Sequence, residues 1–250
     1  MSTIDLNGFP EIPAEAIEQK AADLLEQYSQ WSGRPVVAPV PVEVIAEGML
    51  GYDLDISSDW DIHGFGWLGG IVFGENVIRI SSQVEAHEGR YNFTIAHEIG
   101  HHVLHKQHYM ESHGATTMCR EMGEKPLVEQ QADRFAAALL MPEQNVRAAF
   151  AQTVDGSPPA TNPTTQALRA LAAGVVEKGG FTNVSNTAMV NRLIDLRLVS
   201  GAHYQTGTSQ DFLRRGGLSL GLIRYYLRGM LNRLLHPLRA INQNRKNEDD

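Results

Sequence analysis

Two histidines and a glutamate stand close together in the pattern His97-Glu98-x-x-His101. The four-residue spacing places His97 and His101 one turn apart on the same face of a helix, so both imidazoles can bind one metal ion. Glu98 would lie about 100° further round such a helix. From there it can hold a water at the metal and accept a proton from it without binding the metal itself. The pattern therefore predicts a hydrolytic metal site with Glu98 as the catalytic base.

The third metal ligand is expected in a second segment, in which Glu129 and Asp133 are also four residues apart. On a helix these carboxylates share one face. Glu129 can then complete the site, while Asp133 accepts the second ring N–H of a metal-bound histidine. Imidazole and carboxylate are usual zinc ligands, and catalytic zinc keeps three protein ligands and one water. We therefore expect one Zn²⁺ per chain. The alternative is an amphipathic helix with exposed acids beside a histidine-rich surface helix.

Other groups offer alternative roles around this site. His105 lies on the same helix face as His97, but the two are about 12 Å apart along the axis, too far for one ion with bonds of about 2.0 Å. We interpret His105 as a helix-end residue or as a support for a ligand.

The single cysteine, Cys119, could be an inhibitory ligand, although a small idle or buried thiol is the plainer interpretation. A second donor should stabilise the oxyanion, and the candidates, which no motif places, are His63, His203 and Tyr204.

Longer motifs surround the candidate ligands. They read Phe93-Thr94-x-Ala96-His97-Glu98-x-Gly100-His101, then Glu129-x-x-Ala132-Asp133-x-Phe135-Ala136, then Leu139-Leu140-Met141-Pro142. In these motifs the chain resembles the ImmA/IrrE family of metallopeptidases, over about residues 13–200 and most specifically at 90–142. The resemblance implies a zinc endopeptidase of bacterial, phage or mobile-element origin. It also implies a protein substrate, a helix-turn-helix repressor whose cleavage releases a set of genes.

The hydrophobic periodicity around these motifs predicts an α+β fold. Residues 74–76 form a turn signal between two strand-like runs, and a third run with alternating polarity precedes them. We expect a small antiparallel three-stranded sheet in front of the metal-binding helix. An edge strand at 66–73 or 76–82 could pair with an extended peptide substrate. Helices are expected at 13–29, 42–49, 126–141, 143–151, 164–177 and 185–199, and strands at 52–56, 65–73 and 77–82.

The chain is expected to divide into four parts. Residues 1–154 form the zinc metallopeptidase domain, and the Pro-, Gly- and Ser-containing segment 155–163 is a linker. Residues 164–211 form a helical, helix-turn-helix-like region, and 212–250 form a basic amphipathic helix and tail. The helix after Ser185 has an N-cap residue and an apolar face. Asn186, Asn191, Arg192 and Arg197 are its candidate DNA contacts, but the thin basic charge favours a helical packing module.

The net charge of −8 is unevenly distributed. Residues 212–246 hold eight basic residues and no acid, whereas residues 1–211 carry a net charge of −13. The acidic body should repel nucleic acid, so direct DNA binding is not expected. The basic segment could bind an anionic or protein partner, or dock on the body. With no signal peptide, no apolar run of about 20 residues and one cysteine, we expect a cytoplasmic protein without a membrane span.

Two other classes of function stay open. The first is a transcription-linked binding protein with a structural zinc site. The second is a phage- or antitoxin-associated protein that binds its partner through residues 212–250. Glu98 argues against the first class, because a structural zinc site has no use for a carboxylate that activates water.

Overall fold

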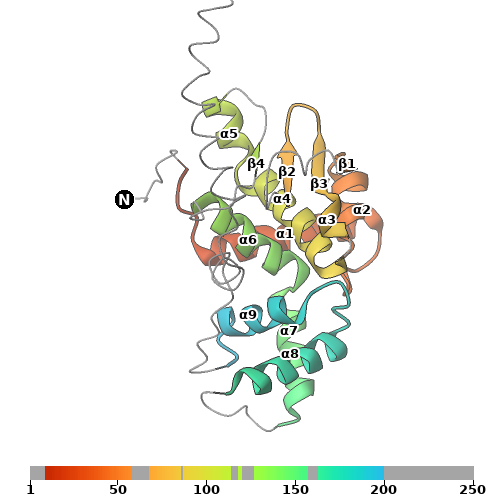
Figure 1. Ribbon diagram of the computed structural model, residues 1–250, viewed down its shortest axis with the longest axis vertical. Coiled ribbons are helices and arrows are strands. Elements are labelled where there is room, and N and C mark those ends of the chain that lie inside the picture. Colours follow the sequence, from red (N-terminus) through yellow and green to blue (C-terminus); the bar gives the residue numbers. More distant parts are fainter. Residues whose placement is uncertain are drawn as a thin grey trace, which may run out of the picture. The chain divides into compact units, whose positions relative to one another are not determined.

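The computed structural model describes residues 9–57, 68–85, 87–113, 118–119, 127–156 and 163–199. These residues form helices and one small sheet, so the predicted α+β class is confirmed (Figure 1). The strands are β1 (Asp53–Ser57), β2 (Gly69–Val72), β3 (Val77–Ser81) and β4 (Met118–Cys119). The helical elements are α1 (Ala14–Ser32), α2 (Val42–Val44), the π-helix η1 (Ile45–Met49), α3 (Ser82–Glu85), α4 (Glu88–Leu104), α5 (Lys106–His113), α6 (Leu127–Leu140), α7 (Glu143–Val154), α8 (Thr165–Gly179) and α9 (Asn186–Asp195).

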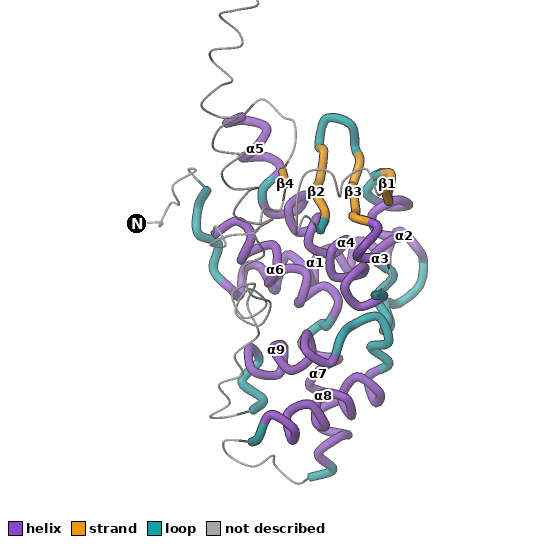
Figure 2. The backbone as a smooth tube through the Cα atoms, in the orientation of Figure 1, coloured by secondary structure: helices purple, strands orange, loops and turns teal. Residues whose placement is uncertain are grey.

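The sheet has the strand order β1-β3-β2-β4. β2 and β3 form the expected antiparallel hairpin, with Val72 opposite Val77 and the turn between them (Figure 2). Asn76 adopts a left-handed backbone conformation in that turn, with φ of 53°, which asparagine tolerates better than most residues. β1 pairs in parallel with β3, and β4 adds a short antiparallel pairing to β2.

The prediction of a wholly antiparallel, three-stranded sheet was therefore wrong. Alternating polarity in a strand shows which side chains face the core, but it does not select the neighbouring strand or its direction. A parallel pair needs a connection of a dozen or more residues, and residues 58–76, which include β2, provide it between β1 and β3. In this sheet β3 lies between two strands, so segment 76–82 is not an edge.

Helix α4 occupies the centre of the part of the chain described here. It packs against β2 and β3 and against α6, and α6 in turn packs against α1 (Figure 1). Ile95 and Ile99 of α4 and Phe135 and Leu139 of α6 are fully buried in this contact region. Burial of such side chains stabilises the fold by roughly 1.5–3 kcal/mol each. The two segments that carry the candidate ligands are therefore fixed by the main hydrophobic core.

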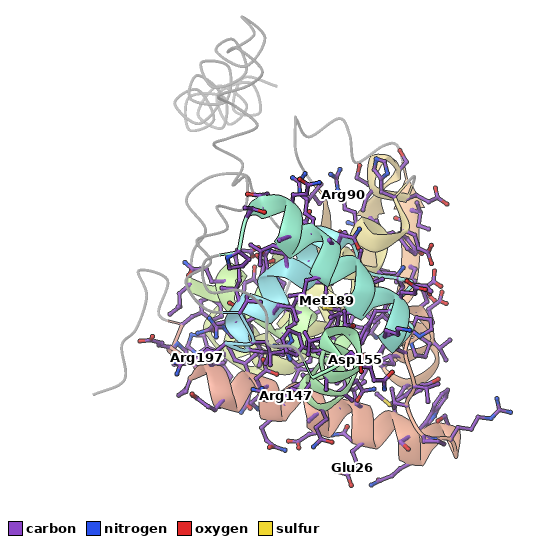
Figure 3. The ribbon with its side chains drawn as sticks, turned by 90° about the horizontal axis from the view of Figure 1, so that it is seen from below. Glu26, Arg90, Arg147, Asp155, Met189 and Arg197 are labelled. Carbon is purple, nitrogen blue, oxygen red and sulfur yellow. The ribbon has the colours of Figure 1, made fainter. Side chains whose placement is uncertain are left out.

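Helices α7, α8 and α9 pack on one another beyond α6. Ser185 caps α9 as predicted, because its hydroxyl accepts a hydrogen bond from the backbone N–H of Ala188 at 3.1 Å. Met189 is fully buried and lies among these helices in Figure 3. Arg192 is only 2% exposed and hydrogen-bonds to the carbonyl of Met141, so it does not present its guanidinium to DNA.

The four-part division of the chain stays a prediction, and residues 212–250 lie outside the described ranges. Among the helices described, none combines the length and the apolar character that crossing a membrane requires.

Candidate metal centre

The candidate ligands meet where α4 and α6 cross at close range. A Cβ atom at Gly100 would lie 3.2 Å from the Cα atom and from the carbonyl oxygen of Ala132. Small residues at both positions let the two backbones approach, which brings the first turn of α6 to the histidine face of α4. His97, His101 and Glu129 are all buried there, with exposed fractions of 0%, 1% and 7%.

Three ligand atoms converge at this crossing. The Nε2 atoms of His97 and His101 are 3.0 Å apart, and each is 3.2 Å from an oxygen of the Glu129 carboxylate. Ligands about 2.0 Å from one tetrahedral ion are separated by about 3.3 Å. The three side chains therefore have the chemistry and the spacing to hold one metal ion, and they form the candidate metal cluster of the described residues.

The hydrogen bond of His97 to Asp133 supports this fit. His97 Nδ1 lies 2.9 Å from an Asp133 oxygen, so the ring donates its Nδ1 proton to the carboxylate. In the neutral ring, the form that binds metal, the Nε2 atom then directs a lone pair toward Glu129 and His101. Lone pairs and a carboxylate facing one another in a buried place repel unless a cation lies between them. The donor set thus fits a divalent metal ion.

The protein groups around the site change the proton affinities of both rings. Burial lowers the pKa of His97, but hydrogen bonds to Asp133 and Glu129 outweigh it and raise that pKa to about 9, with Glu98 adding to the effect. Burial lowers the pKa of His101, although the nearby Glu129 carboxylate acts in the opposite direction. Burial raises the pKa of Glu129, yet both histidines hold it far below its usual range. The carboxylates therefore attract positive charge to this place.

Glu98 lies beside strand β2. Its side chain is 1% exposed, and its carboxylate oxygen is 3.4 Å from the point where a Cβ atom at Gly69 would lie. The same Cβ would come within 2.6 Å of Thr94 Cγ2, so only glycine lets β2 approach α4 this closely. The close approach keeps Glu98 next to His97, whose pKa it helps to raise. A buried carboxylate beside the ligand cluster can exchange protons with a reacting group.

A second set of buried polar groups extends from His101. His101 Nδ1 lies 3.0 Å from His105 Nδ1, and His105 Nε2 lies 2.9 Å from Gln131 Oε1. Burial, assisted by the nearby His101, lowers the pKa of His105 to about 3. His105 is thus placed beside a candidate ligand, as one of the two sequence interpretations expected. Gln131 was not predicted, because a single glutamine on a helix gives no signal in the sequence.

Several other predicted residues have side chains that the structure does not describe. His63, His203 and Tyr204 lie outside the described residues. Cys119 belongs to β4, where its backbone pairs with Gly70, but its side chain is not described. β4 thus pairs with part of the outer side of β2. β2 belongs to segment 66–73, the other candidate edge strand for binding an extended peptide.

Comparison with known proteins agrees with this geometry. A peptidase family model described as the IrrE N-terminal-like domain matches residues 43–158. The match includes α4 and α6 with all three candidate ligands, and it leaves out α1, α8 and α9. A search of curated proteins found no match. On the family model and the motifs it covers, residues 43–158 form a metallopeptidase-type domain of the ImmA/IrrE peptidase family.

Proposed function

We propose that this protein is a zinc-dependent endopeptidase in which His97, His101 and Glu129 hold one zinc ion and Glu98 is the catalytic base. The observation that carries the proposal is the convergence of two imidazole nitrogens and one carboxylate within 3.0–3.2 Å of one another. This donor set is typical of catalytic zinc sites, which keep a fourth position for water or substrate.

The residues of the chain have separate roles in the proposed reaction. Zinc, when bound, supplies a Lewis acid that polarises the scissile carbonyl and lowers the pKa of water. Glu98 accepts the proton of the attacking water and passes it to the nitrogen of the leaving amine. Asp133 accepts the Nδ1–H of His97 and so keeps that ring in the tautomer that binds metal. The buried surroundings of Glu98 strengthen its interactions with the reacting groups.

We also propose that the substrate is a helix-turn-helix repressor, cleaved at one site in the cytoplasm. The family resemblance suggests this substrate class. The charge of the chain supports it, because residues 1–211 carry a net charge of −13 and DNA-binding domains present a basic surface. Long-range attraction between the two would speed their association at low ionic strength. A repressor added as substrate should therefore be cleaved more slowly as the salt concentration rises.

Metal analysis of the purified full-length chain tests the zinc site. We expect about one zinc ion per chain in the wild type, and loss or weakening of binding in His97→Ala and in Glu129→Ala. His87→Ala is the matched control, because His87 is an exposed histidine just before α4. Zinc that survives Glu129→Ala would show that another residue is the third ligand. A wild-type protein that binds no metal, even after zinc is supplied, would contradict the peptidase proposal.

A further inference from the structure

A buried chain of hydrogen bonds connects the N-terminal segment to the metal centre. It runs from the backbone carbonyl of Pro10 through the Gln131 amide and the His105 ring to the His101 ring. The successive distances are 3.1, 2.9 and 3.0 Å. Gln131, His105 and His101 are each no more than 3% exposed. Because water has little access to these groups, each must form its hydrogen bonds with its neighbours in the series.

The donor-to-acceptor direction of this series of hydrogen bonds is set at Pro10. A backbone carbonyl can only accept a hydrogen bond, so the group of Gln131 that faces it must be the NH₂ group. The oxygen of the same amide then faces His105 Nε2. An amide oxygen can only accept, so His105 must carry its proton on Nε2. The backbone of the N-terminal segment therefore determines which nitrogen of His105 is protonated.

His105 in turn fixes the tautomer of His101. Neutral His105 with a proton on Nε2 has a lone pair on Nδ1. Burial favours this neutral form, and the ring is held edge-on to Phe9, with 5.7 Å between ring centroids and an interplanar angle of 85°. The lone pair of His105 Nδ1 must accept the Nδ1 proton of His101. His101 Nε2 is then left unprotonated, facing His97 and Glu129.

We propose that Gln131 and His105 are positioning residues that fix the tautomer and ring orientation of His101 for metal binding. The carbonyl of Pro10 sets the donor-to-acceptor direction of the hydrogen bonds that connect them. His97 obtains the same tautomer by a different means, through the carboxylate of Asp133. The two histidine ligands would thus be prepared by one charged and one neutral partner. This inference rests on the proposed zinc site, although the tautomers themselves can be measured without metal.

The first test is histidine ring ¹⁵N NMR on the metal-free, full-length wild type, with signals assigned by single histidine substitutions. We expect His105 to be protonated on Nε2 and His101 on Nδ1. The opposite tautomer at His101, or a mixture of both, would overturn the proposal whatever the variants do. A wild type that shows the expected tautomers but binds no zinc would refute the proposed function and leave the tautomer assignment standing.

The second test compares Gln131→Met with Gln130→Met. Methionine resembles glutamine in length but cannot connect His105 to Pro10, and Gln130 is an exposed neighbour on the same helix. Zinc affinity, measured by competition with a chromophoric chelator, should fall about 10–100-fold in Gln131→Met and stay unchanged in Gln130→Met. The metal-free Gln131→Met protein should also lose the single tautomer of His101. A folded Gln131→Met protein with wild-type affinity and tautomer would overturn the proposal.

Discussion

Within the described residues, two places bury charged side chains, and they differ in how the charge is balanced. At the first, Arg192 of α9 forms an ion pair with Glu18 of α1 and donates its Nε–H to the carbonyl of Met141 at 2.9 Å. A second guanidinium bond to Glu18 measures 2.8 Å. One positive and one negative charge cancel, and this arrangement is complete as it stands. It connects the helices of the C-terminal half to α1.

The second place, the candidate metal centre, is not balanced in this way. Carboxylate oxygens of Glu129 and Asp133 lie 3.2 and 2.9 Å from the two ring nitrogens of His97, and Glu98 acts electrostatically on the same ring. Burying an unbalanced charge is costly, so such a cluster persists where a counter-charge is supplied. A structural charge pair therefore differs from a candidate ligand site. In the first the protein provides both partners, whereas in the second it provides an excess of acceptors, which favours a bound cation.

The largest effect is expected from Glu98→Gln, which removes the proposed base and keeps the side-chain shape. Turnover of a verified protein substrate should fall about 10²–10⁴-fold, because the glutamine amide cannot accept the water proton. Zinc content should stay at the wild-type level, since Glu98 is not a proposed ligand. Full turnover by this variant would contradict the proposed mechanism and favour a structural metal site. Activity assays with metal analysis on the same samples give both readouts.

Arg192→Met should destabilise the fold by about 3–5 kcal/mol, because it leaves the Glu18 carboxylate and the Met141 carbonyl without their buried partner. Urea unfolding monitored by circular dichroism measures the change. Arg147→Met is the control, since the side chain of Arg147 is about half exposed and pairs with Glu143 on the surface. That pair should contribute less than about 1 kcal/mol. Equal effects of the two substitutions would remove the distinction between a buried and a surface pair.

Zinc should stabilise the wild type against unfolding by about 2.7 kcal/mol when its free concentration is 100 times the dissociation constant. The reason is that only the folded chain brings His97, His101 and Glu129 together. Glu129→Ala should be stabilised against unfolding much less by the same zinc concentration. Arg192→Met should gain as much as the wild type, because the two buried clusters are separate. Thermal unfolding with and without a chelator measures these differences, and a wild type insensitive to zinc would contradict them.

The smallest effect is expected from substitution of Asp133, the hydrogen-bond partner of His97. Asp133→Ala removes the acceptor for the Nδ1–H of His97 and should weaken zinc binding about 10–100-fold. Asp133→Asn keeps an acceptor oxygen but not the charge, so its loss of zinc affinity should be smaller. Glu26→Ala, an exposed acid on α1 that is labelled in Figure 3, controls for a general change in net charge. Chelator competition measures all three, and an Asp133→Ala affinity equal to that of the control would exclude Asp133 as a partner.

The local features of this protein could be predicted from its sequence. The spacing of His97 and His101 placed them on one helix face, and that of Glu129 and Asp133 did the same on another. The turn at 74–76, the cap at Ser185 and the α+β class also followed from local patterns. Such features are predictable because helix and strand periods and capping preferences act over a few neighbouring residues.

Partners that are distant in the sequence became visible only in the folded chain. The tertiary structure showed the parallel pairing of β1 with β3, the ion pair of Arg192 with Glu18, and the connection from Gln131 to Pro10. These pairs depend on how whole elements pack, and a local pattern shows which face is buried without naming the element that covers it. A candidate ligand can therefore be found from its spacing, whereas the groups that orient it appear only when the chain is folded.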